Sequence, residues 1–257
     1  MWQLIGGRMK IFLSAIEGQK KIPRQFAEKG QKMKWNLMSY FAIRKSRENA
    51  EFIRDNSEEI LIDSGAHSFQ KGKKVNWVEY TKEYAEFIQE FDRPNVIGYF
   101  EMDVDNVIGY DKVLELRKML ENVSNKIIPV WHKNRGIEEF KKMCQDYAGK
   151  IVAITGFKNE DIKDDQYVMF LKYARKYDCK VHCLGMTRKK ILDKVPFDYV
   201  DSSSWLQYAV YGQVLNKGKV TKAFSKTSRE IIFEENYKQG MKMQEEYYNK
   251  WRKVNKD

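Results

Sequence analysis

The chain has 257 residues, 42% of them hydrophobic and 32% charged, a composition that fits one folded domain and excludes a disordered or fibrous protein. Its 47 basic residues outnumber its 36 acidic residues, so a polyanion or an acidic substrate is the expected partner. No apolar run approaches the roughly 20 residues that a membrane span needs, and no secretory signal is recognisable. We therefore expect a cytoplasmic protein without membrane contact.

The positive charge is concentrated at the two ends of the chain. Residues 1–54 carry a net charge of +8 and residues 217–257 a net charge of +5, while the middle carries −2. Basic ends around a near-neutral middle suggest surfaces that bind a phosphate backbone. Solvated lysine faces are the alternative interpretation. The candidate nucleic-acid-binding residues are Lys217, Lys219, Lys222, Lys226 and Arg229.

Apolar runs of strand length alternate with longer amphipathic stretches along the whole chain. The predicted strands, in chain order, are Lys10–Ser14, Asn36–Tyr40, Ile60–Asp63, Val96–Met102, Ile127–Trp131, Ile151–Thr155, Val181–Leu184 and Tyr199–Asp201. The predicted helices between and after them are Ser46–Asn56, Asn76–Phe91, Asp111–Asn122, Ile137–Tyr147, Asp165–Tyr177 and a long basic helix over Phe224–Trp251.

Eight such strand-helix units predict a (β/α)8 barrel of the TIM type, with an open doubly wound sheet as the alternative. No low-complexity linker divides the chain, so we expect a single α/β domain over residues 1–257. The barrel is expected over about residues 9–215, followed by a basic helical extension over 216–257.

Polar residues directly after the predicted strands are the candidates for chemistry, because TIM barrels carry their sites at the carboxyl ends of the strands. Asp63, Asp103 and Asp201 each follow an apolar strand, so a barrel would bring the three carboxylates to one mouth. Their mutual repulsion and partial burial could then shift their pKa values. Any one of them could instead cap a helix or close a turn.

Other classes of site lack support. Cys144, Cys179 and Cys183 match neither a disulfide framework nor a paired zinc motif, and the three histidines form no recognised zinc pattern with them. The chain contains no GxGxxG or GxxxxGK[ST] motif for a nucleotide and no GxSxG nucleophile elbow. We therefore predict no metal and no cofactor.

The segments around two of the aspartates resemble the tRNA-guanine transglycosylase superfamily, in particular its small members of the deazaguanine-DNA transglycosylase type. The most specific similarities are Leu61-Ile62-Asp63-Ser64-Gly65-Ala66 and Val200-Asp201-Ser202-Ser203-Ser204-Trp205. Weaker ones are Met102-Asp103, Ile154-Thr155-Gly156-Phe157 and Leu184-Gly185.

The resemblance implies an enzyme that exchanges guanine for a 7-deazaguanine, of the 7-cyano type, through a covalent aspartyl-nucleotide intermediate. Asp201 would be the nucleophile, and Asp63 would transfer protons or stabilise the developing charge. Asp103 would bind the hydrogen-bonding edge of guanine. The other implied base-binding residues are Ser64, Gly65, His67, Trp131, His132, Gly156, Leu184 and Gly185.

Three departures from the family bear on this reading. Ala66 and His67 replace a glycine and a bulkier aromatic, and Trp131-His132 stands where the tRNA enzymes show glutamine followed by glycines. The cysteine-rich zinc module of the tRNA enzymes is absent, which favours DNA over tRNA. Asp198 also fits a Phe-Asp pattern of the family and is the rival nucleophile.

Three alternatives stay open beside base exchange in DNA. They are exchange in tRNA, hydrolytic release of guanine, and a barrel that binds nucleic acid without catalysis. A homodimer is a further expectation from the resemblance.

Overall fold

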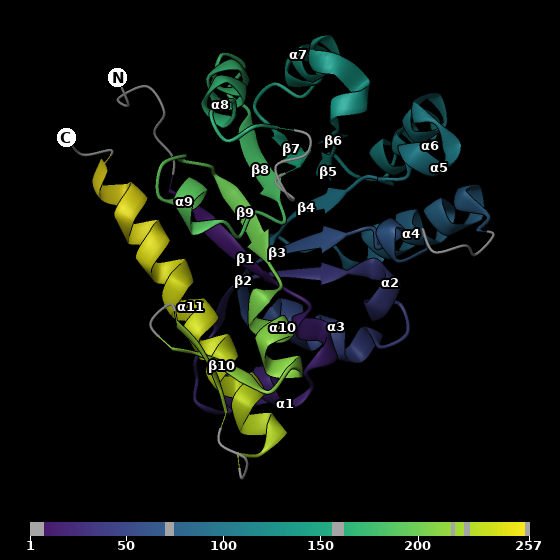
Figure 1. Ribbon diagram of the computed structural model, residues 1–257. Helices are drawn as coiled ribbons and strands as arrows, with labels where there is room; N and C mark the ends of the chain where they lie inside the picture. Colours follow the sequence, from purple (N-terminus) through teal and green to yellow (C-terminus); the bar gives the residue numbers. More distant parts are fainter. Residues whose placement is uncertain (1–7, 70–74, 156–161, 217–218, 224–226, 255–257) are drawn as a thin grey trace.

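The computed structural model describes residues 8–69, 75–155, 162–216, 219–223 and 227–254. Nine parallel strands form a sheet in the order β5-β4-β3-β2-β1-β9-β8-β7-β6, and helices surround it (Figure 1). The strands are β1 (Lys10–Ser14), β2 (Met33–Ser39), β3 (Ser57–Asp63), β4 (Val96–Phe100), β5 (Ile127–Ile128), β6 (Val130–Trp131), β7 (Ile151–Thr155), β8 (Lys180–Leu184) and β9 (Tyr199–Ser202).

The two ends of this sheet, β5 and β6, belong to one stretch of chain interrupted at Pro129. Proline has no backbone N–H and therefore cannot complete the ladder of hydrogen bonds at this position. β5 pairs with β4 and β6 pairs with β7, so the interrupted strand joins both edges. The eight predicted strands are thus confirmed as an almost closed TIM-type barrel, and the open doubly wound sheet is wrong.

Most predicted helices also appear, with boundaries that differ by a few residues. The helices of the outer layer are α1 (Lys21–Glu28), α3 (Arg47–Asp55), α4 (Trp77–Phe91), α6 (Tyr110–Glu121), α7 (Gly136–Asp146), α8 (Tyr167–Arg175) and α11 (Arg229–Val254). Short helical turns follow several strands: η1 (Ile16–Gly18), α2 (Tyr40–Ile43), η2 (Ala66–Phe69), α5 (Asp105–Ile108), η3 (Lys133–Arg135), α9 (Lys189–Leu192) and α10 (Ser204–Val210). No helix in these ranges is both long and apolar enough to cross a membrane.

The strand side chains alternate between the barrel interior and the helix layer, as the pleat requires. The interior is a compact apolar cluster: Phe12, Trp35, Leu37, Leu61, Phe100, Ile128, Val130, Ala153 and Tyr199. Two residues further along several strands, the same inward phase reaches Ser14, Ser39, Asp63, His132 and Asp201. The inward face therefore changes from apolar to polar at the carboxyl ends of the strands.

The C-terminal segment differs from the predicted helical extension. Gln213–Asn216 (β10) and Lys219–Lys222 (β11) form an antiparallel hairpin before α11 begins. α11 lies along the barrel beside β1 (Figure 1), with Tyr237 and Gln244 fully buried. Gln244 Nε2 donates to the carbonyls of Ile11 and Trp35, 2.7 Å from each, where β1 and β2 are not yet paired. The helix is therefore part of the barrel wall, because an amphipathic helix must bury its apolar side.

α11 also fixes which end of the barrel carries the hairpin. Gly240 lies against Leu13 near the end of β1, and Gln244, one turn later, contacts Ile11 nearer its start. The helix thus runs antiparallel to the strands and begins at their carboxyl ends. The hairpin bonds to the first half of the helix through Asn236, whose Oδ1 accepts from Leu215 N at 2.8 Å. The hairpin consequently lies at the same end as the polar strand termini.

Candidate active site

Asp201 is the most extensively bonded of the three predicted carboxylates. Its Oδ1 accepts hydrogen bonds from His182 Nε2 and Gly185 N, both at 2.9 Å, and its Oδ2 accepts from Ser14 Oγ at 3.3 Å. These donors come from β8, the turn after β8, and β1, so three segments fix the carboxylate orientation. The side chain keeps 15% of its surface exposed. Asp201 is therefore held rigidly at the barrel mouth and remains accessible.

His182 lies inside the barrel beneath Asp201 and is fully buried. Its ring contacts Phe100 and Phe12, with centroids 5.0 and 6.3 Å apart. Donation from Nε2 to a carboxylate leaves Nδ1 as the acceptor nitrogen, and Nδ1 has no hydrogen-bond partner within the described ranges. The apolar surroundings thus favour the tautomer that points its proton at Asp201.

Asp63, the last residue of β3, is half-buried beside Gly65. Its Oδ2 accepts a hydrogen bond from Gly65 N at 2.8 Å. Burial raises the pKa of Asp63 to about 6, the Gly65 hydrogen bond opposes this shift, and the negative charges of Asp103 and Asp201 add to it. The mutual influence places the three aspartates in one electrostatic environment, in which Asp63 can carry a proton near neutral pH.

Gly65 is required by the close packing of the segment after β3. Its φ is +72°, and a Cβ there would lie 2.3 Å from Phe41 Cβ and 2.7 Å from Phe41 N. Ser64 is buried, and its carbonyl accepts from Tyr80 Oη at 2.8 Å. His67, in contrast, is exposed on η2.

Asp103 follows β4 and pairs with His132, which follows β6. His132 Nε2 lies 2.6 Å from Asp103 Oδ1. Although burial lowers the pKa of His132, the hydrogen bond and the charge of Asp103 raise it overall above the ordinary value. Asp103 keeps 30% of its side chain exposed, so the pair presents polar atoms to the mouth.

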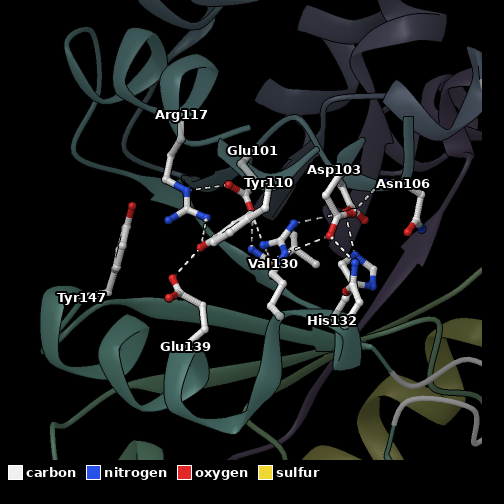
Figure 2. A network of polar contacts seen from close by, with 12 residues as sticks. Glu101, Asp103, Asn106, Tyr110, Arg117, Val130, His132, Glu139 and Tyr147 are labelled. Carbon is white, nitrogen blue, oxygen red and sulfur yellow. Dashed lines mark hydrogen bonds and ion pairs between the residues drawn. The ribbon is translucent and has the colours of Figure 1, made fainter. Parts of the chain in front are cut away.

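A buried ion-pair network lies next to the Asp103–His132 pair (Figure 2). The fully buried Glu101 bonds to Arg117 Nε at 2.5 Å, to Arg135 at 3.2 Å and to Val130 N at 2.7 Å. Arg135 also bonds to Asp105 Oδ2 at 3.1 Å. Burial would raise the pKa of Asp105, but the charge of Arg135 and the hydrogen bonds around it lower it overall.

Asp103, Asp105 and His132 are close enough to be considered as metal ligands, since one ligand atom of each lies within 4.8 Å of the others. Arg135 already places its guanidinium against this group, 3.1 Å from Asp105 and 3.9 Å from Asp103. A cation bound there would have to displace the Arg135 guanidinium or lie directly beside its positive charge. The residues therefore fit an ion-pair network better than a metal site.

Two predicted residues are placed away from the mouth. Trp131 is a correction: its indole is buried between the barrel and the helix layer, its ring centroid 4.9 Å from that of Phe170, and its Nε1 donates to Gly136 O at 2.8 Å. Alternation along β6 gives the inward direction to Val130 and His132 instead. Asp198 lies before β9 at the opposite end, where its Oδ2 accepts from Val181 N and pairs with Arg175, both at 2.7 Å.

The remaining base-binding predictions depend on the loops after β7 and β8. Leu184 ends β8, and Gly185 has a φ of +62° with its amide directed at Asp201. Gly156 lies outside the described residues.

Among the basic candidates, Lys222 ends β11 and Arg229 begins α11, and both are exposed. Lys219 begins β11. Lys217 and Lys226 lie outside the described residues. Three site features had no clear sequence signal: Ser14, the buried network around Glu101, and Glu17 in η1.

Comparison with known proteins identifies the fold alone. No family model matches the chain, and no curated protein matches it. Among solved structures, the chain is similar to a putative fructose-1,6-biphosphate aldolase from Coccidioides immitis, with a TM-score of 0.52 and 14% identity over 95% of this chain and 88% of that one. Such low identity supports the α/β barrel and assigns no activity.

Proposed function

We propose that this chain is a base-exchange transglycosylase that replaces guanine in DNA by a 7-deazaguanine through an aspartyl-nucleotide intermediate. The observation that carries the proposal is the presence, at one barrel mouth, of two carboxyl groups in different environments, Asp201 and Asp63. Asp201 is an oriented acceptor, while Asp63 has a raised pKa of about 6. Cleavage of a glycosidic bond with a covalent intermediate needs a nucleophilic carboxylate and a second carboxyl that transfers protons.

The proposed reaction assigns the first displacement to Asp201. Its less-bonded oxygen, Oδ2, attacks C1′ of the target nucleotide, and the C1′–N9 bond breaks with its electron pair leaving on guanine. Asp63 supplies the proton that the departing base takes up. His182, Gly185 and Ser14 hold the nucleophile, so little reorganisation is needed when the carboxylate reacts.

The second displacement reverses these roles. The incoming 7-deazaguanine attacks C1′, the ester bond to Asp201 breaks, and the proton lost by the incoming base returns to the carboxyl groups of the site. Asp103 accepts hydrogen bonds from the N1 and N2 edge of the base, and His132 holds Asp103 for this task. No cofactor enters this scheme.

The choice of DNA is supported by what surrounds the mouth. The exposed Lys222 and Arg229 lie at the same barrel end as the aspartates, where they can contact a phosphate backbone. The nucleotide must leave any duplex to bring C1′ to Asp201. All three cysteines are buried free thiols in the apolar layer between the strands and the helices, so they supply no zinc module of the kind that the tRNA enzymes carry.

The test is base exchange by the purified chain with single-stranded DNA, duplex DNA and tRNA as separate substrates. Radiolabelled guanine is supplied first, and unlabelled 7-cyano-7-deazaguanine then competes for incorporation. We expect label in DNA, none with Asp201→Asn, and unchanged incorporation with the exposed control Asp111→Asn. Label only in tRNA would transfer the assignment to tRNA, and guanine release without uptake would indicate hydrolysis. Tight binding without either would favour a non-catalytic barrel.

A further inference from the structure

Glu17 is a carboxyl group at the barrel mouth that the proposed reaction does not yet use. It lies in η1, directly after β1. Ala15, which connects the two, has a φ of 69°, a left-handed conformation that is unfavourable for a residue with a side chain. Ala15 N donates to Leu37 O at 3.2 Å, which holds this turn against β2. The backbone is therefore bent sharply at the point that positions Glu17.

The Glu17 carboxyl group is only half satisfied by hydrogen bonds. Its Oε1 accepts from Ser39 N at 3.1 Å, whereas Oε2 is buried and has no partner within the described ranges. The backbone carbonyl of Glu17 accepts from Asn49 Nδ2 at 3.1 Å, so α3 fixes the turn from the other side. A buried carboxyl oxygen without a donor is better accommodated when it carries a proton itself.

Ser39 connects Glu17 with Asp63. Ser39 is the last residue of β2 and lies opposite Asp63 in the register of β2 and β3. The Gly65 segment, whose amide binds Asp63, packs closely on Ser39, since a Cβ on Gly65 would lie 2.7 Å from Ser39 Oγ. Within the described residues, Asp63 is the titratable group whose charge acts on Glu17, while β2 and α3 present the Ser39 amide and Asn49.

The two carboxyl groups differ in the pH at which they lose a proton. Burial raises the pKa of Glu17 to about 7, against the opposing hydrogen bond from Ser39, and the charge of Asp63 adds to the shift. The pKa of Asp63 is about 6. Near neutral pH, Glu17 therefore keeps a proton when Asp63 is ionised.

We propose that Glu17 is a proton store that acts through Asp63, so that the two carboxyl groups together hold the one proton that base exchange requires. This inference rests on the proposed function. The departing base gains a proton at N9 when the C1′–N9 bond breaks, and the incoming base loses one when its bond to C1′ forms. The exchange therefore consumes no proton overall, but the site must hold one between the two displacements. Glu17 is a positioning residue in this scheme, since it acts on Asp63 and not on the base.

The test measures the titration of the side-chain carboxyl groups by 13C NMR in the full chain without substrate. Glu17→Gln retains an oxygen that can accept from Ser39 N and removes the titration. We expect a wild-type resonance with a midpoint near pH 7 that disappears in Glu17→Gln, while the Asp63 midpoint stays near 6, because Glu17 still carries its proton when Asp63 titrates. Asp63→Asn should lower the Glu17 midpoint in turn. Glu28→Gln, an exposed glutamate of α1, serves as the matched control and should change neither midpoint.

The pH profile of base exchange gives a second measurement. A purely structural role of Glu17 would not change this profile. With wild-type protein we expect the rate to fall above pH 7, and with Glu17→Gln we expect the fall to begin about one pH unit lower, near the Asp63 midpoint. A Glu17 midpoint near 4.5, or a Glu17 midpoint unchanged by Asp63→Asn, would overturn the proposal. Shifted midpoints with no exchange on any nucleic acid would instead overturn the proposed function and leave the carboxyl pair intact.

Discussion

The imidazole of His182 donates from Nε2 to Asp201 Oδ1 across 2.9 Å, from a fully buried position inside the barrel. This contact connects the apolar interior with the polar mouth, because the same ring packs on Phe100. It also makes Asp201 the carboxylate whose orientation depends most directly on the barrel itself.

Replacing Asp201 tests the nucleophile. Asp201→Asn keeps the shape and an oxygen acceptor but removes the attacking carboxylate, so base exchange should fall by at least about a thousandfold while binding of nucleic acid remains. Quenched reactions analysed by mass spectrometry should show a nucleotide adduct on the wild type only. An adduct that persists in Asp201→Asn would assign the nucleophile elsewhere.

The raised pKa of Asp63 predicts a specific dependence of stability on pH. Between about pH 4 and pH 6 the folded state binds more protons at this residue than the unfolded state does, so the free energy of unfolding should fall as the pH rises. The loss amounts to roughly 2–3 kcal/mol at most.

Asp63→Asn removes this dependence while keeping an acceptor for Gly65 N. The variant should be more stable than the wild type at pH 8 and should lose this advantage at pH 4, as measured by denaturant unfolding at the two pH values. The exposed Asp111→Asn provides the control. Equal effects of Asp63→Asn at both pH values would contradict the predicted shift.

The buried network around Glu101 should be far more sensitive to substitution than surface ion pairs. Glu101→Gln leaves Arg117 without a buried partner charge and Arg135 with Asp105 alone, so the free energy of unfolding should fall by about 3–5 kcal/mol. Glu115→Gln removes an exposed pair with Lys112 and should change it by less than about 1 kcal/mol. Thermal unfolding of both variants measures the difference, and similar melting temperatures would refute it.

Two glycines with positive φ provide a matched test of close packing. Gly185→Ala meets open space and adds only the left-handed strain of about 1–2 kcal/mol, whereas Gly65→Ala also places a methyl group against the Phe41 backbone. We expect Gly185→Ala to fold with a slightly lower melting temperature and Gly65→Ala to fold poorly or with the β3 terminus displaced. Comparable melting temperatures for the two variants would show that the Phe41 segment adjusts easily.

The salt dependence of binding tests the predicted phosphate contacts. Lys222→Gln and Arg229→Gln should each weaken binding of single-stranded DNA and reduce the slope of log K against log salt by about 0.7. Lys118→Gln, on the exposed side of α6, should leave the slope unchanged. Fluorescence anisotropy over a series of salt concentrations gives the slopes directly.

The strands were predictable because their signals are local. Lys10–Ser14 and Ile151–Thr155 match the structure at both ends, since a buried parallel strand is a continuous apolar run with clear borders. The convergence of Asp63, Asp103 and Asp201 followed from the barrel rule, once eight units had been counted.

The features that were missed depend on contacts between distant segments. Trp131 and His132 are neighbours in sequence, and only the register of β6 decides which one points inward. Glu17 looks like a surface glutamate in the sequence, because its partners Ser39 and Asn49 lie 22 and 32 residues away. The role of α11 likewise depends on Gln244 reaching two strands more than 200 residues earlier in the chain, which no local pattern reveals.

The position of Gln244 has a consequence for how the protein is made. β1 is synthesised more than 200 residues before Gln244, yet its start is connected to β2 by this side chain of α11. Until α11 is synthesised, one of the barrel's first strands lacks its outer cover and exposes apolar surface. The wall around β1 is therefore completed only after α11 has been translated, and before that the exposed apolar surface favours aggregation of the nascent chain.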